Sequence, residues 1–165
     1  MTDIVLQDIT EADYDRLVEI NRAEIQHTSP MDRNRLQELV SYSCFAKAAV
    51  ISGKIVAFVL AMRENAPYVN ANYLWFSKRY SQFLYIDRIV VAREQSGMGL
   101  GSRMYREVFQ FAATEHLPLV GCEINVIPPN PASHKFHEKL GFREVGRQWL
   151  ADNSKQVSMQ IVEIV

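Results

Sequence analysis

The chain has 165 residues, of which 48% are hydrophobic, and a formal net charge of −1 at pH 7. This composition predicts one globular domain over residues 1–165 with a core of its own. Because no basic run and no apolar run of membrane-spanning length occurs, we expect neither nucleic acid nor a membrane as a partner. The N-terminus resembles no signal peptide, and Cys44 and Cys122 fit neither a metal site nor a disulfide framework. A cytoplasmic location follows as an expectation.

The N-terminal part of the chain alternates strand and helix patterns. Thr10 is followed three residues later by Asp13, a pairing that predicts the start of a helix. The expected elements are a strand at 4–6, a helix from Thr10 to about 29–30, a helix at about 32–43, and strands at 46–51 and 55–62.

Residues 63–82 interrupt this alternation. They are rich in Tyr, Trp, Phe and Asn and have no steady period. A long connection of this kind is more often a binding loop than a spacer. Three interpretations stay open: contact with a substrate, a surface covered by a partner such as the second copy in a homodimer, and a flap packed on the core.

Residues 83–91 and 119–126 are predicted to be central strands, because both are apolar on their two faces. Each contains a carboxylate, Asp87 in the first and Glu123 in the second. Alternation places Tyr85 and Asp87 on one face of the first strand and Arg88 on the other. A carboxylate inside an apolar strand serves either as a base with a raised pKa or in a structural ion pair. Residues 144–150 and 157–164 predict a final antiparallel pair.

The glycine-rich segment 96–101, SGMGLG, lies between the first central strand and an amphipathic helix. Amide groups at a helix start have no intrahelical acceptor, and glycines let a phosphate approach them closely. A P-loop is excluded because no lysine precedes Ser102. A dinucleotide-binding fingerprint is excluded because glycine is missing at Ser102 and Met104, where the two possible registers require it. The segment therefore predicts a pyrophosphate site, with a turn that only reverses the chain as the alternative.

Two motifs together resemble the GNAT superfamily of N-acetyltransferases. Residues 96–101 resemble its acyl-coenzyme A loop, Arg/Gln-x-x-Gly-x-Gly/Ala, with Ser96 departing at the first position. Residues 130–142, NPASHKFHEKLGF, resemble the second motif, Asn-x-x-Ala-x-x-x-Tyr-Glu-Lys-Leu-Gly-Phe. The local chemistry agrees, because Asn130 can cap a helix, Pro131 suits its first position and Gly141 can end it.

The resemblance implies a mixed α/β fold with a mostly antiparallel central sheet of about six to seven strands and about four flanking helices. It also implies an acetyl-CoA-dependent N-acetyltransferase that moves the acetyl group to a primary amine directly, without a covalent intermediate. The helices at 10–30 and 32–43 would flank the acceptor entrance. The residues expected to contact acetyl-CoA are Ile89, Val90, Val91, Ser96, Gly97, Met98, Gly99, Leu100, Gly101, Ser102, Asn130, Ser133 and Phe136.

Acetyl transfer requires a base for the amine and an acid for the leaving thiolate. We favour Glu123 over Asp87 as the base. His137 stands where the family has its tyrosine acid, so it could donate a proton, take one from the amine, or only pack. Tyr85 is the other candidate acid. The remaining histidines, His27, His116 and His134, are expected at the surface, and no metal site is expected.

Two other functions stay open from sequence: a non-catalytic acyl-coenzyme A-binding protein and a protein-interaction module. Protein N-termini, lysines, amino acids, polyamines and drugs are all compatible acceptors. The cysteines are expected to be buried small residues without a nucleophilic role.

Overall fold

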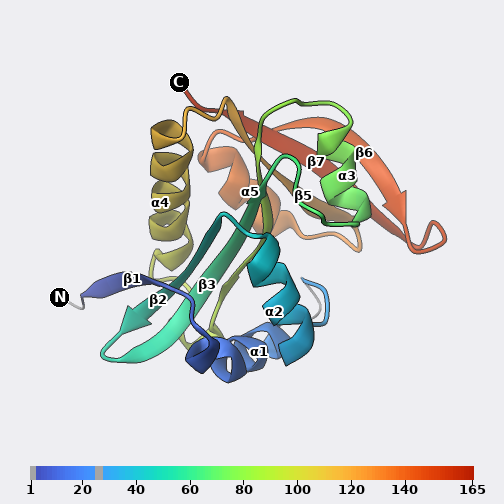
Figure 1. The fold of residues 1–165 in the computed structure, drawn as a ribbon. Coiled ribbons are helices and arrows are strands. Elements are labelled where there is room, and N and C mark those ends of the chain that lie inside the picture. The colour runs from blue at the N-terminus through green and yellow to red at the C-terminus, as the bar shows by residue number, and fades with distance from the viewer. Residues whose placement is uncertain (1–2, 25–27) are drawn as a thin grey trace. The chain divides into compact units, whose positions relative to one another are not determined.

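A computed structural model describes residues 3–24 and 28–165 of the chain (Figure 1). Its elements in order are β1 (Ile4–Asp8), the 3₁₀ helix η1 (Glu11–Asp13), α1 (Tyr14–Ala23), α2 (Arg33–Tyr42), β2 (Phe45–Ile51), β3 (Lys54–Arg63), α3 (Ala71–Ser77), β4 (Leu84–Val91), the 3₁₀ helix η2 (Arg93–Gln95), α4 (Leu100–Thr114), β5 (Leu119–Ile127), α5 (Pro131–Lys139), β6 (Arg143–Leu150) and β7 (Lys155–Glu163). His27, expected at the surface, lies outside the described residues.

The strands form one hydrogen-bonded order, β1-β2-β3-β4-β5-β7-β6. The β1–β2, β2–β3, β5–β7 and β6–β7 pairs are antiparallel, whereas β4 and β5 pair in parallel at Leu84–Val120 and Tyr85–Gly121. The predicted fold class, a mixed α/β fold with a mostly antiparallel sheet, is therefore confirmed.

Two compact units share these elements. Unit 1 comprises Met1–Met62 and Ile86–Val108, and unit 2 comprises Arg63–Tyr85 and Phe109–Val165. The single domain over residues 1–165 stays a prediction, and each unit is described by itself.

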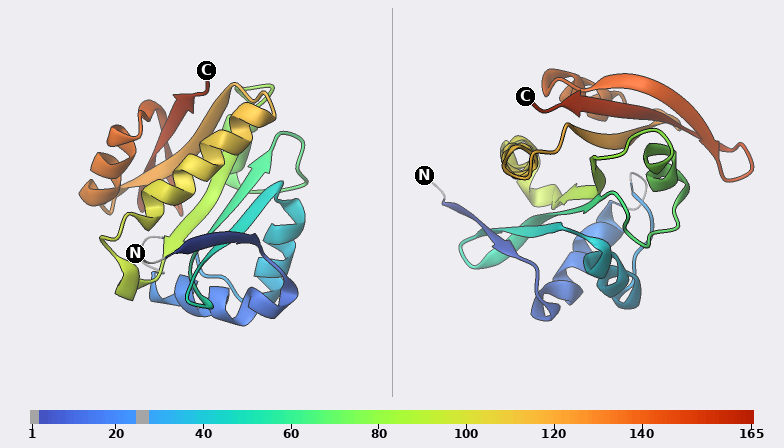
Figure 2. Two further views of the ribbon diagram at one scale, coloured as in Figure 1. Left: turned by 90° about the vertical axis from the view of Figure 1, so that its left-hand side faces the viewer. Right: turned by 45° about the horizontal axis from the view of Figure 1, so that its top comes forward.

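In unit 1, α1 and α2 lie on one face of the strands and the first part of α4 lies on the other (Figure 2). The predicted start at Thr10 is confirmed, since the Asp13 carboxylate accepts the Thr10 backbone N–H at 2.9 Å. Leu17 of α1 and Leu36 and Leu39 of α2 are fully buried. Their burial holds the two helices on the sheet by the hydrophobic effect.

In unit 2, α3 and α5 lie on opposite faces of the strands (Figure 2). The α3 aromatics approach the sheet so closely that only glycine fits beneath them. A Cβ at Gly121 would lie 2.7 Å from the Phe76 ring, and one at Gly146 would lie 2.5 Å from Trp75. Glycine inside a strand commonly marks such a close approach.

The expectation of an irregular connection over residues 63–82 was wrong, because Ala71–Ser77 form α3. Asn70 caps this helix, and its side chain accepts the N–H groups of Asn72 and Tyr73. Tyr73 and Phe76 are almost fully buried at 2% and 0% exposure. Packing on the core, one of the three interpretations, describes these aromatics. The 3.6-residue period escaped detection because the helix has only seven residues, four of which, Tyr73–Phe76, form a continuous aromatic and apolar run.

The two cysteines differ in burial. Cys122 is buried as expected, but Cys44 is exposed and the expectation of a buried residue was wrong. Cys44 lies just before β2, where its Sγ is 3.7 Å from the Ala61 carbonyl oxygen. Neither cysteine is in a disulfide.

Candidate active site

Residues 96–99 form an exposed turn that leads into α4, which begins at Leu100. Gly97 and Gly99 have φ angles of +79° and +76°, whereas a Cβ at either position would meet no other atom within 4 Å. The backbone angle, not crowding, therefore demands glycine at both positions. Left-handed residues in a turn can direct successive N–H groups toward one concave side, an arrangement that binds anions.

The start of α4 is fixed by buried side chains behind this turn. Leu100 is 2% exposed, and Met104 and Val108 are fully buried. The Arg103 N–H donates to the Gly99 carbonyl at 3.0 Å, so helical hydrogen bonding begins within the turn. The amides that precede Arg103 in the helix have no intrahelical acceptor, and the helix dipole places positive potential beside them. This geometry suits a phosphate.

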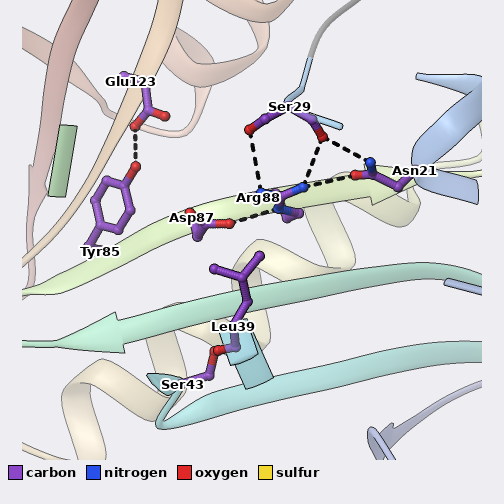
Figure 3. A network of polar contacts seen from close by, with 8 residues as sticks. All are labelled: Asn21, Ser29, Leu39, Ser43, Tyr85, Asp87, Arg88 and Glu123. Carbon is purple, nitrogen blue, oxygen red and sulfur yellow. Dashed lines mark hydrogen bonds and ion pairs between the residues drawn. The ribbon is translucent and has the colours of Figure 1, made fainter. Parts of the chain in front are cut away.

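Asp87 belongs to a buried charged network in unit 1 (Figure 3). Its Oδ2 accepts from Arg88 Nε at 2.7 Å, and both side chains are only 4% exposed. Arg88 Nη1 also donates to Asn21 Oδ1 at 3.2 Å and to the Ser29 carbonyl at 3.1 Å. The expectation that Asp87 and Arg88 point to opposite faces did not foresee this pair, because the long Arg88 side chain folds back toward its neighbour. Asp87 thus fits the structural ion pair that sequence analysis left open.

Glu123 has a different partner in unit 2. Its Oε2 accepts a hydrogen bond from the Tyr85 hydroxyl at 2.8 Å (Figure 3). Tyr85 is 1% exposed and packs edge-on against Tyr73, with ring centroids 5.6 Å apart. The adjacent parallel strands β4 and β5 bring the phenol and the carboxylate together, since Tyr85 pairs with Gly121. Glu123 is half-buried, and the Tyr85 phenol that donates to it is a neutral group.

The second motif forms α5 as predicted. Asn130 caps the helix through its side-chain oxygen, which accepts the Ser133 N–H at 3.3 Å, and Pro131 is the first helical residue. Gly141, with φ +97°, follows the helix end. Ser133 and Phe136 lie half-buried on the helix. The capping role of Asn130 is thus established, while its contact with acetyl-CoA stays a prediction.

His137 is 7% exposed and faces the interior of unit 2. Its Nδ1 lies 2.8 Å from the Ser133 carbonyl oxygen, so in the neutral ring Nδ1 carries the proton and donates it there. The ring makes edge-on contacts with Phe136 and Phe142. Burial lowers the pKa of His137 below its ordinary value, although the Ser133 hydrogen bond acts the other way. The imidazole is therefore held in its neutral form near neutral pH.

The remaining expected cofactor residues lie on β4. Ile89 and Val91 are half-buried and Val90 is 3% exposed. Just after the strand, the Ala92 N–H donates to the Val56 carbonyl of β3 at 2.8 Å. Main-chain binding of the pantetheine arm here stays a prediction. Ser102, in the first turn of α4, is half-buried.

Asn21 and Ser29 were not singled out by sequence analysis, and Arg88 was noted only for the face of the strand to which it points. The sequence did contain a signal for the ion pair. Burying an arginine inside an apolar strand costs free energy unless a carboxylate pairs with it, and Asp87 is the neighbour of Arg88. Asn21 and Ser29 carried no comparable signal. Among the described residues, no group of three or more His, Cys, Asp and Glu side chains is placed to hold a metal ion.

A family model described as "Acetyltransferase (GNAT) family" matches residues 7–142, more than half of the chain. The chain belongs to the GNAT family. As a GNAT acetyltransferase it takes acetyl-CoA as its acetyl donor. A comparison with curated protein sequences found no match.

Solved structures share the GNAT fold at low sequence identity. Ard1 from Thermoplasma volcanium is 14% identical with a TM-score of 0.79, and the match covers 98% of each chain. The ribosomal-protein-S18-alanine N-acetyltransferase from Escherichia coli is 14% identical with a TM-score of 0.75, covering 98% of this chain and 94% of that one. Arabidopsis thaliana Naa50, in complex with the bisubstrate analogue CoA-Ac-MVNAL, is 15% identical with a TM-score of 0.73, covering 96% and 97%.

The described residues fit the acetyl donor of this GNAT enzyme at its phosphate end. The left-handed Gly97 and Gly99 and the open space beside them leave room for phosphate oxygens at the start of α4. None of the helices among the described residues has the length and apolar character needed to cross a bilayer.

Proposed function

We propose that this GNAT acetyltransferase moves the acetyl group directly to a primary amine, with Glu123 as the base. The new N–C bond forms as the thioester C–S bond breaks, the amine loses a proton, and the thiolate gains one. The observation that carries the proposal is the 2.8 Å hydrogen bond from Tyr85 to Glu123. Several solved structures with this fold are named N-acetyltransferases, which supports an amine acceptor by analogy.

Glu123 suits the base better than Asp87 on physical grounds. A primary amine with a pKa of about 10 is mostly protonated near neutrality, so it must lose a proton before it can attack. The Tyr85 hydroxyl occupies one bond to Oε2 of Glu123, and a carboxylate can accept at both oxygens. Asp87, by contrast, is already held in a buried ion pair with Arg88, so we favour Glu123 as the base.

Two groups are candidates for the acid. Tyr85 carries a proton that it donates to Glu123, and the pair could pass protons between them. His137 stands at the position of the family's tyrosine, but its lowered pKa disfavours the imidazolium form. If His137 is the acid, activity should fall as pH rises through a value below its ordinary pKa of about 6.5. If Tyr85 is the acid, no falling limb should occur in that range.

Thiol release from acetyl-CoA with a panel of primary amines tests the proposal. Glu123→Gln keeps an oxygen that can accept from Tyr85 but removes the basic site, so kcat should drop by roughly 10²–10⁴-fold. The Kd for acetyl-CoA should not change. Tyr85→Phe and His137→Phe, compared in the same assay over pH, separate the two acids. A Glu123→Gln enzyme with the wild-type kcat would exclude Glu123 as the base.

Direct transfer has its own test. We propose that neither cysteine carries the acetyl group: Cys122 is only 4% exposed, and Cys44 is exposed just before β2. Intact-mass measurement after incubation with acetyl-CoA alone should show no acetylated protein, and Cys44→Ala and Cys122→Ala should keep the wild-type kcat. Loss of turnover in a folded cysteine variant would point to a covalent route instead. The cytoplasmic location, the homodimer and the lack of a nucleic-acid partner stay predictions.

A further inference from the structure

We propose that two aromatic residues of α3, Tyr73 and Phe76, are positioning residues for acetyl transfer. They hold the Tyr85 ring so that its hydroxyl stays in hydrogen-bond contact with Glu123. The proposal rests on Glu123 as the base, proposed above, and gives the helix between β3 and β4 a role in the reaction. All four residues belong to unit 2.

Both α3 aromatics pack directly on the Tyr85 ring. The Tyr73 ring meets it edge-on at an interplanar angle of 75°, with the ring centroids 5.6 Å apart. The Phe76 ring is tilted at 50° to it, also with the centroids 5.6 Å apart. None of the three side chains is more than 2% exposed. Because buried side chains are packed as densely as organic crystals, the direction of the Tyr85 hydroxyl depends on these two neighbours.

Tyr73 is itself anchored at both ends. Its hydroxyl donates to the Arg63 carbonyl at 2.6 Å and accepts the Ala66 N–H at 3.0 Å. These two bonds tie the tip of the ring to the end of β3 and the residues that follow it. At the other end, the Tyr73 N–H donates to the side chain of Asn70, the residue that caps α3. Tyr73 therefore gives Tyr85 a fixed surface to pack on.

Phe76 connects the two strands that carry Tyr85 and Glu123. Gly121 pairs with Tyr85 between the parallel strands β4 and β5, and it lies two residues before Glu123. A Cβ at Gly121 would lie 2.7 Å from the Phe76 ring, so this ring rests directly on β5. Because the same ring packs on Tyr85, it holds Tyr85 in place relative to the strand of Glu123. The hydroxyl then lies 2.8 Å from Oε2 of Glu123 (Figure 3).

A fixed hydroxyl beside the base bears directly on the rate. The Tyr85 O–H takes one bonding position on Oε2 and leaves the rest of the carboxylate to accept from the amine. A displacement of about 1 Å in a reacting group can slow a reaction roughly 10²-fold. Tyr73 and Phe76 act on the reaction only through Tyr85. They should therefore affect kcat and not the affinity for acetyl-CoA.

A double-mutant cycle on kcat tests the positioning role. Tyr73→Leu removes a ring that supports Tyr85 and should lower kcat by roughly ten- to hundredfold, the effect of a misplaced reacting group. The Kd for acetyl-CoA should not change. In a Tyr85→Phe background the hydroxyl is already absent, so Tyr73→Leu should then lower kcat by no more than about twofold. Tyr73→Phe keeps the ring and should stay within about twofold of the wild-type kcat.

Tyr105→Leu is the matched control for the loss of a buried tyrosine ring. Tyr105 is fully buried on α4 and belongs to unit 1. Its substitution should change kcat by the same factor with and without Tyr85→Phe, since sites that do not interact contribute additively. If Tyr73→Leu does not fold, Phe76→Leu, which removes less of the side chain, takes its place in the cycle with the same expected result.

The positioning role and the proposed base fail in different ways. A wild-type kcat in Tyr85→Phe or in Tyr73→Leu overturns the positioning role and leaves Glu123 as the base. The same holds if Tyr73→Leu lowers kcat by an equal factor in both backgrounds, because the ring would then support the fold and not Tyr85. A wild-type kcat in Glu123→Gln overturns the base, and the positioning role with it.

Discussion

Each of the two units of this GNAT acetyltransferase has a carboxylate inside a strand, but the two carboxylates have different kinds of partner. In unit 1, Asp87 pairs with the buried Arg88, which is itself held by Asn21 and Ser29. In unit 2, Glu123 accepts from the neutral phenol of Tyr85. A cation beside a buried carboxylate offsets part of the cost of burying its charge, whereas a neutral phenol contributes a hydrogen bond without a charge.

This difference is the reason for proposing Glu123, rather than Asp87, as the base. Two acidic residues on neighbouring central strands look alike in sequence, and only their partners distinguish them. A buried ion pair whose other hydrogen bonds are also satisfied holds its two residues in place. Removing one member of the pair leaves an uncompensated buried charge. We propose that Glu123, which accepts from Tyr85, supplies the base that acetyl transfer requires.

The largest expected effect comes from breaking the ion pair. Arg88→Met leaves Asp87 buried without its cation and should reduce the free energy of unfolding by roughly 3–5 kcal/mol. Denaturant unfolding followed by circular dichroism measures the loss. Glu123→Gln, which removes no cation, should change the same free energy much less.

A double variant supplies the control. Arg88→Met combined with Asp87→Leu removes both charges, so most of the lost stability should return, because a buried ion pair can be replaced by apolar residues at little cost. A double variant as unstable as Arg88→Met alone would show that the hydrogen bonds to Asn21 and Ser29, and not the charge pair, are what Arg88 provides.

A new carboxylate in the glycine turn tests the phosphate site predicted there. Gly99→Glu places negative charge beside the helix start, so acetyl-CoA affinity should fall by at least about tenfold through loss of charge-assisted contacts. Gly99→Ala controls for the backbone, since it imposes only the cost of φ +76° on a residue with a Cβ, roughly 1–2 kcal/mol. Isothermal titration calorimetry measures both. Unchanged affinity in Gly99→Glu would remove the phosphate site from this turn.

The smallest effect concerns His137 in the interior of unit 2. Burial lowers its pKa in the folded state, so between that lowered value and about 6.5 the unfolded chain binds more protons than the folded one. Stability should therefore fall as pH drops below about 6.5. His137→Phe, which keeps an aromatic ring between Phe136 and Phe142, should weaken this dependence.

Thermal unfolding at about pH 7.5 and about pH 5.5 compares the variants within the window where histidine titrates. His116→Asn is the control, because His116 is exposed and has φ +57°, a conformation that asparagine tolerates. It should lose as much stability between the two pH values as the wild-type protein does. A His137→Phe variant with the wild-type pH dependence would contradict the buried neutral imidazole.

The sequence predicted most helices and strands, because the residues that start, end or pattern such an element lie close together in the chain. The Thr10 and Asn130 caps, the glycine turn before α4 and the final strand pair all depend on residues a few positions apart. The sequence did not predict helix α3. Its aromatic side chains are buried on several sides of the helix, between the sheet and the rest of their own segment, so no single apolar face marks the helix.

The sequence by itself determined the family, because the two motifs place glycines and a capped helix at a fixed spacing along the chain. It also determined which residues are able to move protons: Tyr85, Asp87, Glu123 and His137. Only the tertiary structure decided their partners, since a pKa and a hydrogen bond depend on groups that are distant in sequence. Arg88 reached Asp87 because a long side chain can fold back across its own strand, and Tyr85 reached Glu123 because β4 and β5 are parallel neighbours.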